Sequence, residues 1–172
     1  MADAVYPKFK YELLNQTFTL DLNTNLFVAL VETDATGGDV AVNAAYDGAD
    51  KYLSDVFTGI TTTEYLGQQS AANLLANGVI AIVQLTGANT TTVSANAIFD
   101  AANVTFSAVP AFDDGGGASS GDGNALIIYA NNTTVQNSQL IAWLDTSVTG
   151  LAVTPNATDI NLNWSDSGIF EL

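Results

Sequence analysis

The hydrophobic positions of this chain fall into short runs that are separated by turn residues. In residues 103–109 and 159–164, apolar and polar side chains alternate, which is the period of a strand with one buried face. Other β-rich apolar runs indicate further strands, at 26–32, 79–85, 97–101, 125–130, 139–145, 150–154 and 168–172. Short strands at this regular spacing predict a mainly β fold, and more specifically an antiparallel β-sandwich or jelly roll.

Residues 4–16 have the pattern of a short helix ahead of the strands. Phe9 and Leu13 are four residues apart, so they share one face of a helix. Asp3 is placed to cap the first turn. Pro7 is tolerated in that turn because the N–H that it lacks has no helical partner there.

This pattern predicts an N-terminal helical arm at residues 1–16 and a single β-sandwich domain at 17–172. Within the domain, residues 65–75 fit either a strand, which Asn77 and Gly78 would close into a hairpin, or a short helix. No stretch has the apolar length of a signal peptide or of a transmembrane helix. We therefore expect neither.

The charge of the chain restricts its partners and its chemistry. Eighteen acidic residues stand against three lysines, and arginine, histidine and cysteine are missing, so the formal net charge is −15. A protein that binds nucleic acid or an anionic membrane surface needs many Lys and Arg side chains. The low number of lysines therefore excludes both as direct partners. The usual general base and thiolate ligands are missing as well. We therefore expect a protein without enzymatic activity and without a cofactor.

One acidic, glycine-rich loop, FDDGGGASSGDGN at residues 112–124, is the candidate metal site. Its oxygen ligands to Ca²⁺ would be Asp113, Asp114, Asp122 and Asn124, and Ca²⁺ takes six to eight oxygens. The spacing does not match an EF-hand loop. Glycine permits any backbone angle and charge keeps a loop in water. The composition therefore favours a hinge or surface excursion between strands over a metal site.

Two further candidates have simpler structural interpretations. Lys51 lies between Asp50 and Asp55. A desolvated lysine is a nucleophile, but neighbouring carboxylates hold it protonated, which favours a local ion pair that orders a turn. Trp143 and Trp164 could form a platform for a sugar. Both stand in runs with strand character, which favours packing in the core.

The outline of the chain resembles a group of small structural proteins in the virions of tailed bacteriophages. A short N-terminal helix comes first, and the resemblance then covers most of the chain. It is carried by the segments LDLNTNLFVALVE, DKYLSDV, FDAANVTFSAV, ALIIYANN, NSQLIAWLD and VTPNATDINLNWSDSGIFEL. The glycine-acidic insert at 113–124 and the lack of arginine depart from the pattern. These motifs are patterns of strand and turn, and they transfer no catalytic residue.

The resemblance implies a non-enzymatic virion protein that decorates or cements the outer surface of the capsid. Its expected partners are the major capsid protein and copies of itself, as a homotrimer. We expect the shell to be contacted by Tyr6, Lys8, Phe9 and Lys10, and the sandwich to stay folded without residues 1–16. The alternatives are a tail, neck or fibre component and, from another class, a jelly-roll module for carbohydrate binding or Ca²⁺-dependent adhesion.

Overall fold

The structure is a computed structural model of the chain. It describes residues 3–22, 25–33, 46–57, 78–93, 96–109, 123–132, 134, 137–145, 148 and 150–172. In these ranges the fold is mainly β, and all paired strands are antiparallel. The more specific prediction of a sandwich or jelly roll stays a prediction.

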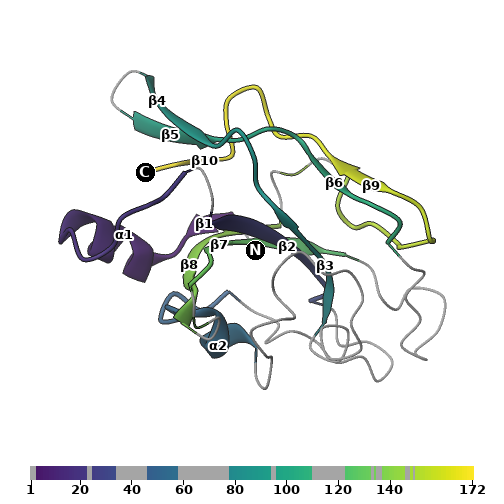
Figure 1. Cartoon of the computed structure of the whole chain (residues 1–172), viewed down its shortest axis with the longest axis horizontal. Coiled ribbons are helices and arrows are strands. Elements are labelled where there is room, and N and C mark those ends of the chain that lie inside the picture. Colours follow the sequence, from purple (N-terminus) through teal and green to yellow (C-terminus); the bar gives the residue numbers. More distant parts are fainter. Residues whose placement is uncertain are drawn as a thin grey trace.

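A five-stranded sheet forms the middle of the molecule (Figure 1). Its strands, in spatial order, are β1 (Ala4–Val5), β8 (Gln139–Leu144), β7 (Ala125–Ala130), β2 (Leu26–Val31) and β3 (Val79–Gln84). All six side chains of β2, of β7 and of β8 are buried. Since successive side chains point to opposite faces, both faces of this sheet are covered, as in a middle layer.

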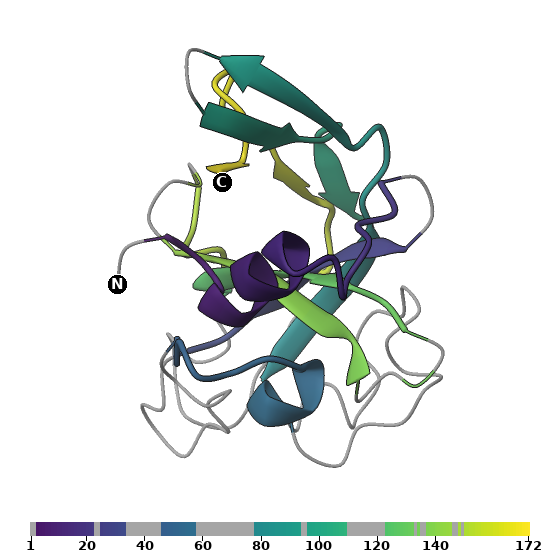
Figure 2. The ribbon, with the colours of Figure 1, turned by 90° about the vertical axis from the view of Figure 1, so that its left-hand side faces the viewer.

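Two smaller sheets lie on one side of the central sheet, and a short helix lies on the other (Figures 1 and 2). One small sheet has the order β10 (Phe170–Glu171), β5 (Asn96–Asp100) and β4 (Asn89–Val93), and the other pairs β6 (Val104–Phe106) with β9 (Ile160–Leu162). The helix is α2 (Leu53–Val56). On β6 and β9 the outer side chains Thr105 and Asn161 share a hydrogen bond of 2.7 Å. The alternation read in these two strands is thus confirmed.

The N-terminal segment is joined to the central sheet. Residues Ala4–Val5 form the edge strand β1 against β8, so the helix α1 (Pro7–Leu14) begins three residues later than predicted. Asp3 does not cap it, because Asp3 Oδ1 accepts the backbone N–H of Asp145 at 2.8 Å. The division into an arm at 1–16 and a domain at 17–172 stays a prediction, and in the structure β1 pairs with β8 of the central sheet.

Most of the other predicted strands are present, with two differences. Residues 150–154 form no extended strand, and Val153 makes only an isolated bridge to Gly123. The strand β4 was not predicted. The ambiguous segment 65–75 lies outside the described residues. The longest helix in the described part of the chain, α1, has eight residues, and no helix there is long and apolar enough to cross a membrane.

The turn before β10 requires glycine. Gly168 has φ +92°, and a Cβ at this position would overlap Ile98 Cγ2 and lie 3.1 Å from the carbonyl oxygen of Phe99. Gly150 has a similar φ of +102°, but apart from its chain neighbours no atom of the described residues lies within 4 Å of the place that a Cβ would occupy there. The two glycines therefore share the same backbone strain on substitution and differ in the space around them.

We expect Gly168→Ala to destabilise the fold more than Gly150→Ala. Each substitution costs roughly 1–3 kcal/mol because of the strained backbone, and crowding against Ile98 adds about 1–3 kcal/mol at position 168 alone. Urea unfolding of the two variants and the wild type measures the difference. Equal losses at the two positions would show that the β10 turn does not pack against β5 as described.

Candidate docking surface

The helix α1 is fixed to the central sheet at its first turn. The strand β1 that precedes it pairs with β8, and the backbone N–H of Tyr6 donates to Ile141 O at 2.9 Å. Pro7 takes the first helical position, where its fixed φ suits a helix and its missing N–H costs nothing. The backbone thereby determines which side of α1 meets the core.

The inner side of α1 is formed by two of the residues that were expected to contact a capsid. Tyr6 and Phe9 are both fully buried, and the ring of Phe9 meets that of Phe18 edge to face, with centroids 5.8 Å apart. Their side chains cannot contact another protein in this conformation. Lys8 and Lys10 are exposed, so these two remain on the outside as expected.

The outer side of α1 carries the largest exposed apolar side chains in the described part of the chain. Leu14 is 84% exposed and Tyr11 is 65% exposed. They are joined by Leu172, which is 42% exposed, and Leu13, Leu14 and Leu172 line a shallow hollow of about 320 Å³ with Lys10. Leu13 is half-buried against the core, so we call the other five residues the α1 outer face: Lys8, Lys10, Tyr11, Leu14 and Leu172.

Sequence reasoning missed Tyr11, Leu14 and Leu172. The helix has apolar residues on more than one side, and the pattern alone does not show which side the sheet covers. The sequence does contain one signal of an exposed apolar side. Phe9 and Leu13 lie on one side of the helix and Tyr11 and Leu14 on another, so a sheet that covers one pair leaves the other pair in water. A surface that keeps several large apolar groups in water is characteristic of an interaction site.

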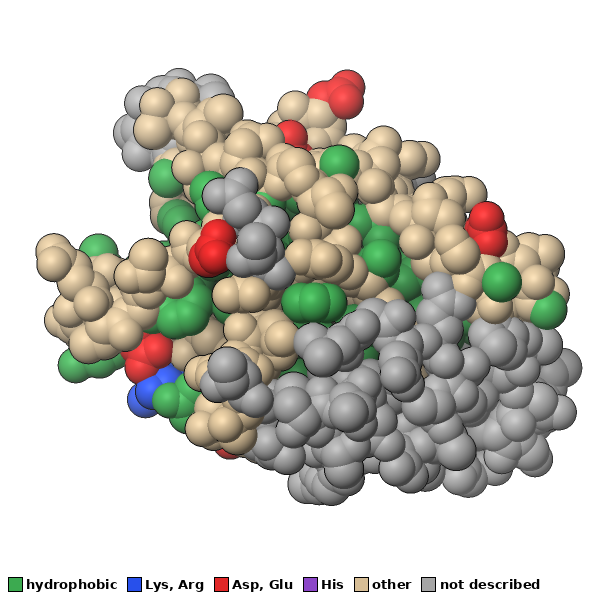
Figure 3. All heavy atoms as spheres, in the orientation of Figure 1, with side chains coloured by type: hydrophobic (Ala, Val, Ile, Leu, Met, Phe, Trp, Pro, Cys, Tyr) green, Lys and Arg blue, Asp and Glu red, His purple; other side chains and the backbone are tan. Residues whose placement is uncertain are grey.

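All positive side-chain charge of the chain lies on or beside α1. The chain has three lysines and no arginine. Two of the lysines stand on α1, and the third, Lys51, pairs with Glu12 of α1 at an Nζ–Oε1 distance of 2.5 Å. Figure 3 shows carboxylates scattered over one face of the molecule, whereas lysine is visible only near α1. The α1 outer face is therefore the least negative part of a strongly acidic surface.

The ion pair of Lys51 has a different partner from the one predicted. Its ammonium lies 4.5 Å from the centre of the Tyr52 ring and pairs with Glu12, while the Asp55 carboxylate accepts the backbone N–H groups of Lys51 and Tyr52, each at 2.8 Å. The hydrogen bond to Glu12 raises the pKa of Lys51. A protonated lysine is not a nucleophile, and the pair instead links α1 to the start of α2.

Beside the inner side of α1 lies a group of tyrosines and aspartates. The rings of Tyr6 and Tyr46 are 5.1 Å apart, and the Tyr6 hydroxyl is buried with no hydrogen-bond partner among the described residues. Burial, followed by the carboxylates of Asp47 and Asp55, raises the pKa of Asp50 to about 6. Burial and the nearby carboxylates also raise the pKa of Tyr6. Asp50 therefore ionises less readily in the folded protein than a solvated aspartate does.

The candidate metal ligands are not brought together in the described structure. Asp113, Asp114 and Asp122 lie outside the described residues. Asn124 lies just before β7, where its N–H donates to Val31 O at 2.9 Å and its Oδ1 is buried without a hydrogen-bond partner within the described part. In the ranges that the structure describes, no group of three or more acidic side chains is placed to hold a metal ion.

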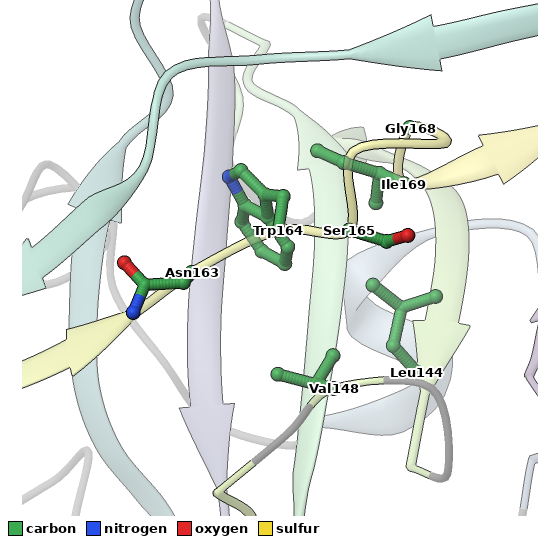
Figure 4. Close-up of a pocket in the computed structure, with 7 residues that line it drawn as sticks. All are labelled: Leu144, Val148, Asn163, Trp164, Ser165, Gly168 and Ile169. Atoms are coloured by element: carbon green, nitrogen blue, oxygen red, sulfur yellow. The ribbon is translucent and has the colours of Figure 1, made fainter.

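The two tryptophans belong to the fold. Trp143 is 3% exposed, and its indole N–H donates to Asp145 Oδ2 at 3.3 Å. Trp164 is half-buried and donates to Ala102 O at 3.0 Å. In Figure 4, Leu144 and Val148 point from the end of β8 toward the segment that carries Trp164, around a space of only about 10 Å³. That space fits a single water molecule and is too small for a sugar.

A polar hollow of about 220 Å³ lies between the end of α1 and the β7–β8 connection. Two of its lining residues, Gln139 and Asn131, form hydrogen bonds to residues outside the lining. Gln139 Nε2 donates to Lys51 O at 3.0 Å and to Leu140 O at 3.2 Å, and Ser138 Oγ donates to Asn131 Oδ1 at 3.3 Å. These bonds fasten the β7–β8 connection to the residues before α2, which is a structural role.

Comparison of the chain with protein-family models, with curated proteins and with solved structures gives no match.

We expect Phe9→Ala and Tyr11→Ala to differ sharply although the residues are two apart on one helix. Removing the buried Phe9 ring should cost about 3–5 kcal/mol of unfolding free energy, because the core cannot refill the space completely. Truncating the exposed Tyr11 ring should change it by no more than about 0.5 kcal/mol. Urea unfolding checks both values. A similar loss for the two variants would contradict the assignment of inner and outer sides.

We expect Asp50→Asn to stabilise the protein at neutral pH. The folded-state pKa of about 6 lies above the ordinary value near 3.9, so the folded state binds the proton more tightly. Stability contributed by the protonated form is therefore present at low pH and is lost as pH rises through about 6. The gain of the variant over wild type should be full above pH 7 and small at pH 4, measured by thermal unfolding. Asp166→Asn, at an exposed turn, is the control and should show no such trend.

Proposed function

We propose that the protein is a non-enzymatic structural protein of a tailed-phage virion, which decorates or cements the outer surface of the capsid. The observation that carries the attachment role is the α1 outer face, where exposed apolar side chains coincide with two of the three lysines of the chain. The assignment to a virion rests on the resemblance of the sequence outline. The major capsid protein is the proposed partner.

The chemistry of the α1 outer face suits attachment to a protein surface. Leu14 and Tyr11 project from a helix that is fixed through Tyr6 and β1, so little conformational entropy is lost when they bind. Aromatic and apolar anchors of this kind supply most of the energy of protein interfaces. Lys8 and Lys10 flank them and reduce the repulsion that a chain of net charge −15 meets at an acidic partner.

A decoration role places modest demands on each contact. Many copies bind a symmetric shell, so contacts that are weak singly become strong in combination when copies also touch one another. A stiff, layered β body of the sandwich type, as proposed here, keeps the attachment helix in a fixed orientation. The predicted homotrimer would suit three-fold positions of such a shell and stays a prediction.

The alternatives gain less support from the described residues. A tail, neck or fibre component would use the same α1 outer face and differ only in its partner. A carbohydrate-binding module loses its proposed platform, because Trp143 is buried and Trp164 borders a space for one water molecule. Adhesion through Ca²⁺ would depend on the 113–124 loop, most of which lies outside the described residues.

We expect Leu14→Glu to abolish most binding to the shell. The test uses capsids of the same phage that lack this protein, mixed with purified protein and sedimented. Burial of a carboxylate at the centre of an apolar contact costs more than about 1.4 kcal/mol, which corresponds to a tenfold change in affinity. The amount of bound protein should therefore fall at least tenfold. Because Leu14 is 84% exposed, thermal stability should not change.

The matched control is Ser107→Glu, which adds the same charge at the exposed turn after β6, at the other end of the molecule from α1 in Figure 1. This variant should bind like wild type. Wild-type protein that fails to sediment with capsids would contradict the capsid role. Undiminished binding of Leu14→Glu would leave that role intact and contradict the assignment of the α1 outer face.

A further inference from the structure

The outer edge of the strand β4 is exposed and bears no charge. β4 is the last strand of its sheet and pairs only with β5 among the described strands. Its sequence is NTTTV, and Thr90, Thr91 and Thr92 are all exposed. The pairing with β5 runs through five residues without a register shift, so the strand has no bulge that would turn its edge away.

The other sheet edges in the described part of the chain are protected. The edge strands β1 and β10 have two residues each, and β10 ends in Glu171. β6 and β9, which form the edges of the two-stranded sheet, have three residues each. The edge strand β3 is buried from Val79 to Ile82. Short length, charge and coverage are the ways in which natural proteins prevent strand addition. Among the described residues nothing of this kind protects β4, since it is five residues long, uncharged and free of proline, and its first four residues are exposed.

We propose that β4 is a self-association surface, at which two copies of the chain pair their β4 strands antiparallel about a two-fold axis at Thr91. This register uses all five residues, placing Thr91 opposite its own copy, Thr90 opposite Thr92 and Asn89 opposite Val93. It joins two three-stranded sheets into one of six strands. The contact goes beyond the proposed capsid role and does not depend on it.

The side chains of this pairing are compatible with one another. Threonine is β-branched and favours strands, and directly opposed threonines form favourable cross-strand pairs. The backbone supplies further hydrogen bonds, because alternate N–H and C=O groups of an edge strand point away from its sheet. A symmetric contact of this kind requires self-complementarity, and a nearly uniform threonine strand meets that requirement.

Electrostatics permit contact between two copies at this edge. Each copy carries a net charge of −15, so most approaches are repelled. The nearest acidic group on the neighbouring strand is Asp100, opposite Asn89. In the two-fold arrangement the two Asp100 residues lie at opposite ends, about 13 Å apart along the strands and three strand spacings, about 14 Å, across them. Their separation of roughly 20 Å exceeds the Debye length of about 8 Å.

The contact has a definite expected strength. Pairing of two five-residue strands buries much less than the roughly 1,200 Å² of a stable interface, so the dimer is weak in dilute solution. It becomes populated at high protein concentration, or where copies are held side by side. Since a two-fold contact yields pairs, this surface is separate from any that would form the predicted homotrimer.

The wild-type chain contains no cysteine, so introduced cysteines allow a direct test by disulfide trapping. The variants Thr90→Cys, Thr91→Cys and Thr92→Cys each carry one thiol, and Thr105→Cys is the matched control, an exposed threonine in the middle of β6. Purified proteins are oxidised mildly, and dimers are counted on non-reducing gels. Thr91→Cys should cross-link at least tenfold faster than Thr105→Cys, because directly opposed Cβ atoms lie about 4.5–5.5 Å apart, close to the disulfide range.

The register gives a second, independent measurement. Thr90→Cys and Thr92→Cys should each cross-link slowly alone, whereas an equal mixture of the two should cross-link to each other rapidly. Adding Thr91→Glu to both chains places two carboxylates at the axis and should slow the mixed reaction at least tenfold. Equal rates at positions 91 and 105, or mixed cross-linking that is insensitive to Thr91→Glu, would overturn the proposal. Unchanged thermal unfolding of the reduced variants shows that they are folded.

Discussion

The structure depends on the burial of the central sheet on both faces. The strands β2, β7 and β8 carry apolar side chains at nearly every position, so neither face can be left in water without a large loss of hydrophobic free energy. The small sheets cover one face and α2 lies against the other. Tyr6 and Phe9 complete the cover beside β8. The N-terminal segment therefore contributes Tyr6 and Phe9 to the core.

This constraint also explains which surfaces remain for partners. A helix that covers the margin of a sheet buries one side only, so Tyr11 and Leu14 stay in water while Phe9 does not. A small sheet laid over a larger one ends in a strand that the core does not need, and that strand is β4. Neither surface contributes much to folding. The stability of the monomer therefore does not explain the exposed apolar groups of the α1 outer face or the unprotected edge of β4.

The sequence was sufficient to predict strands that are buried evenly on both faces or on one face only. Continuous apolar runs at 125–130 and 139–145 correspond closely to β7 and β8, and the alternation at 159–164 corresponds to β9. The threonines of β4 have no apolar partners to reveal a period, so this strand was missed. The orientation of α1 and the pairing of Lys51 with Glu12 depend on tertiary contacts between distant segments. No local pattern contains that information, which is why Tyr6 and Phe9 were assigned to the wrong side.

Charge then selects among the possible contacts. A net charge of −15 on 172 residues keeps copies apart wherever carboxylates face each other within a Debye length. Contacts are therefore expected only where the surface is locally neutral or positive. The α1 outer face has Lys8 and Lys10, and β4 has no ionisable side chain at all. The two surfaces differ in chemistry, since one offers apolar side chains and the other a backbone edge. A single copy can therefore use both without competition, one toward a foreign protein and one toward its own kind.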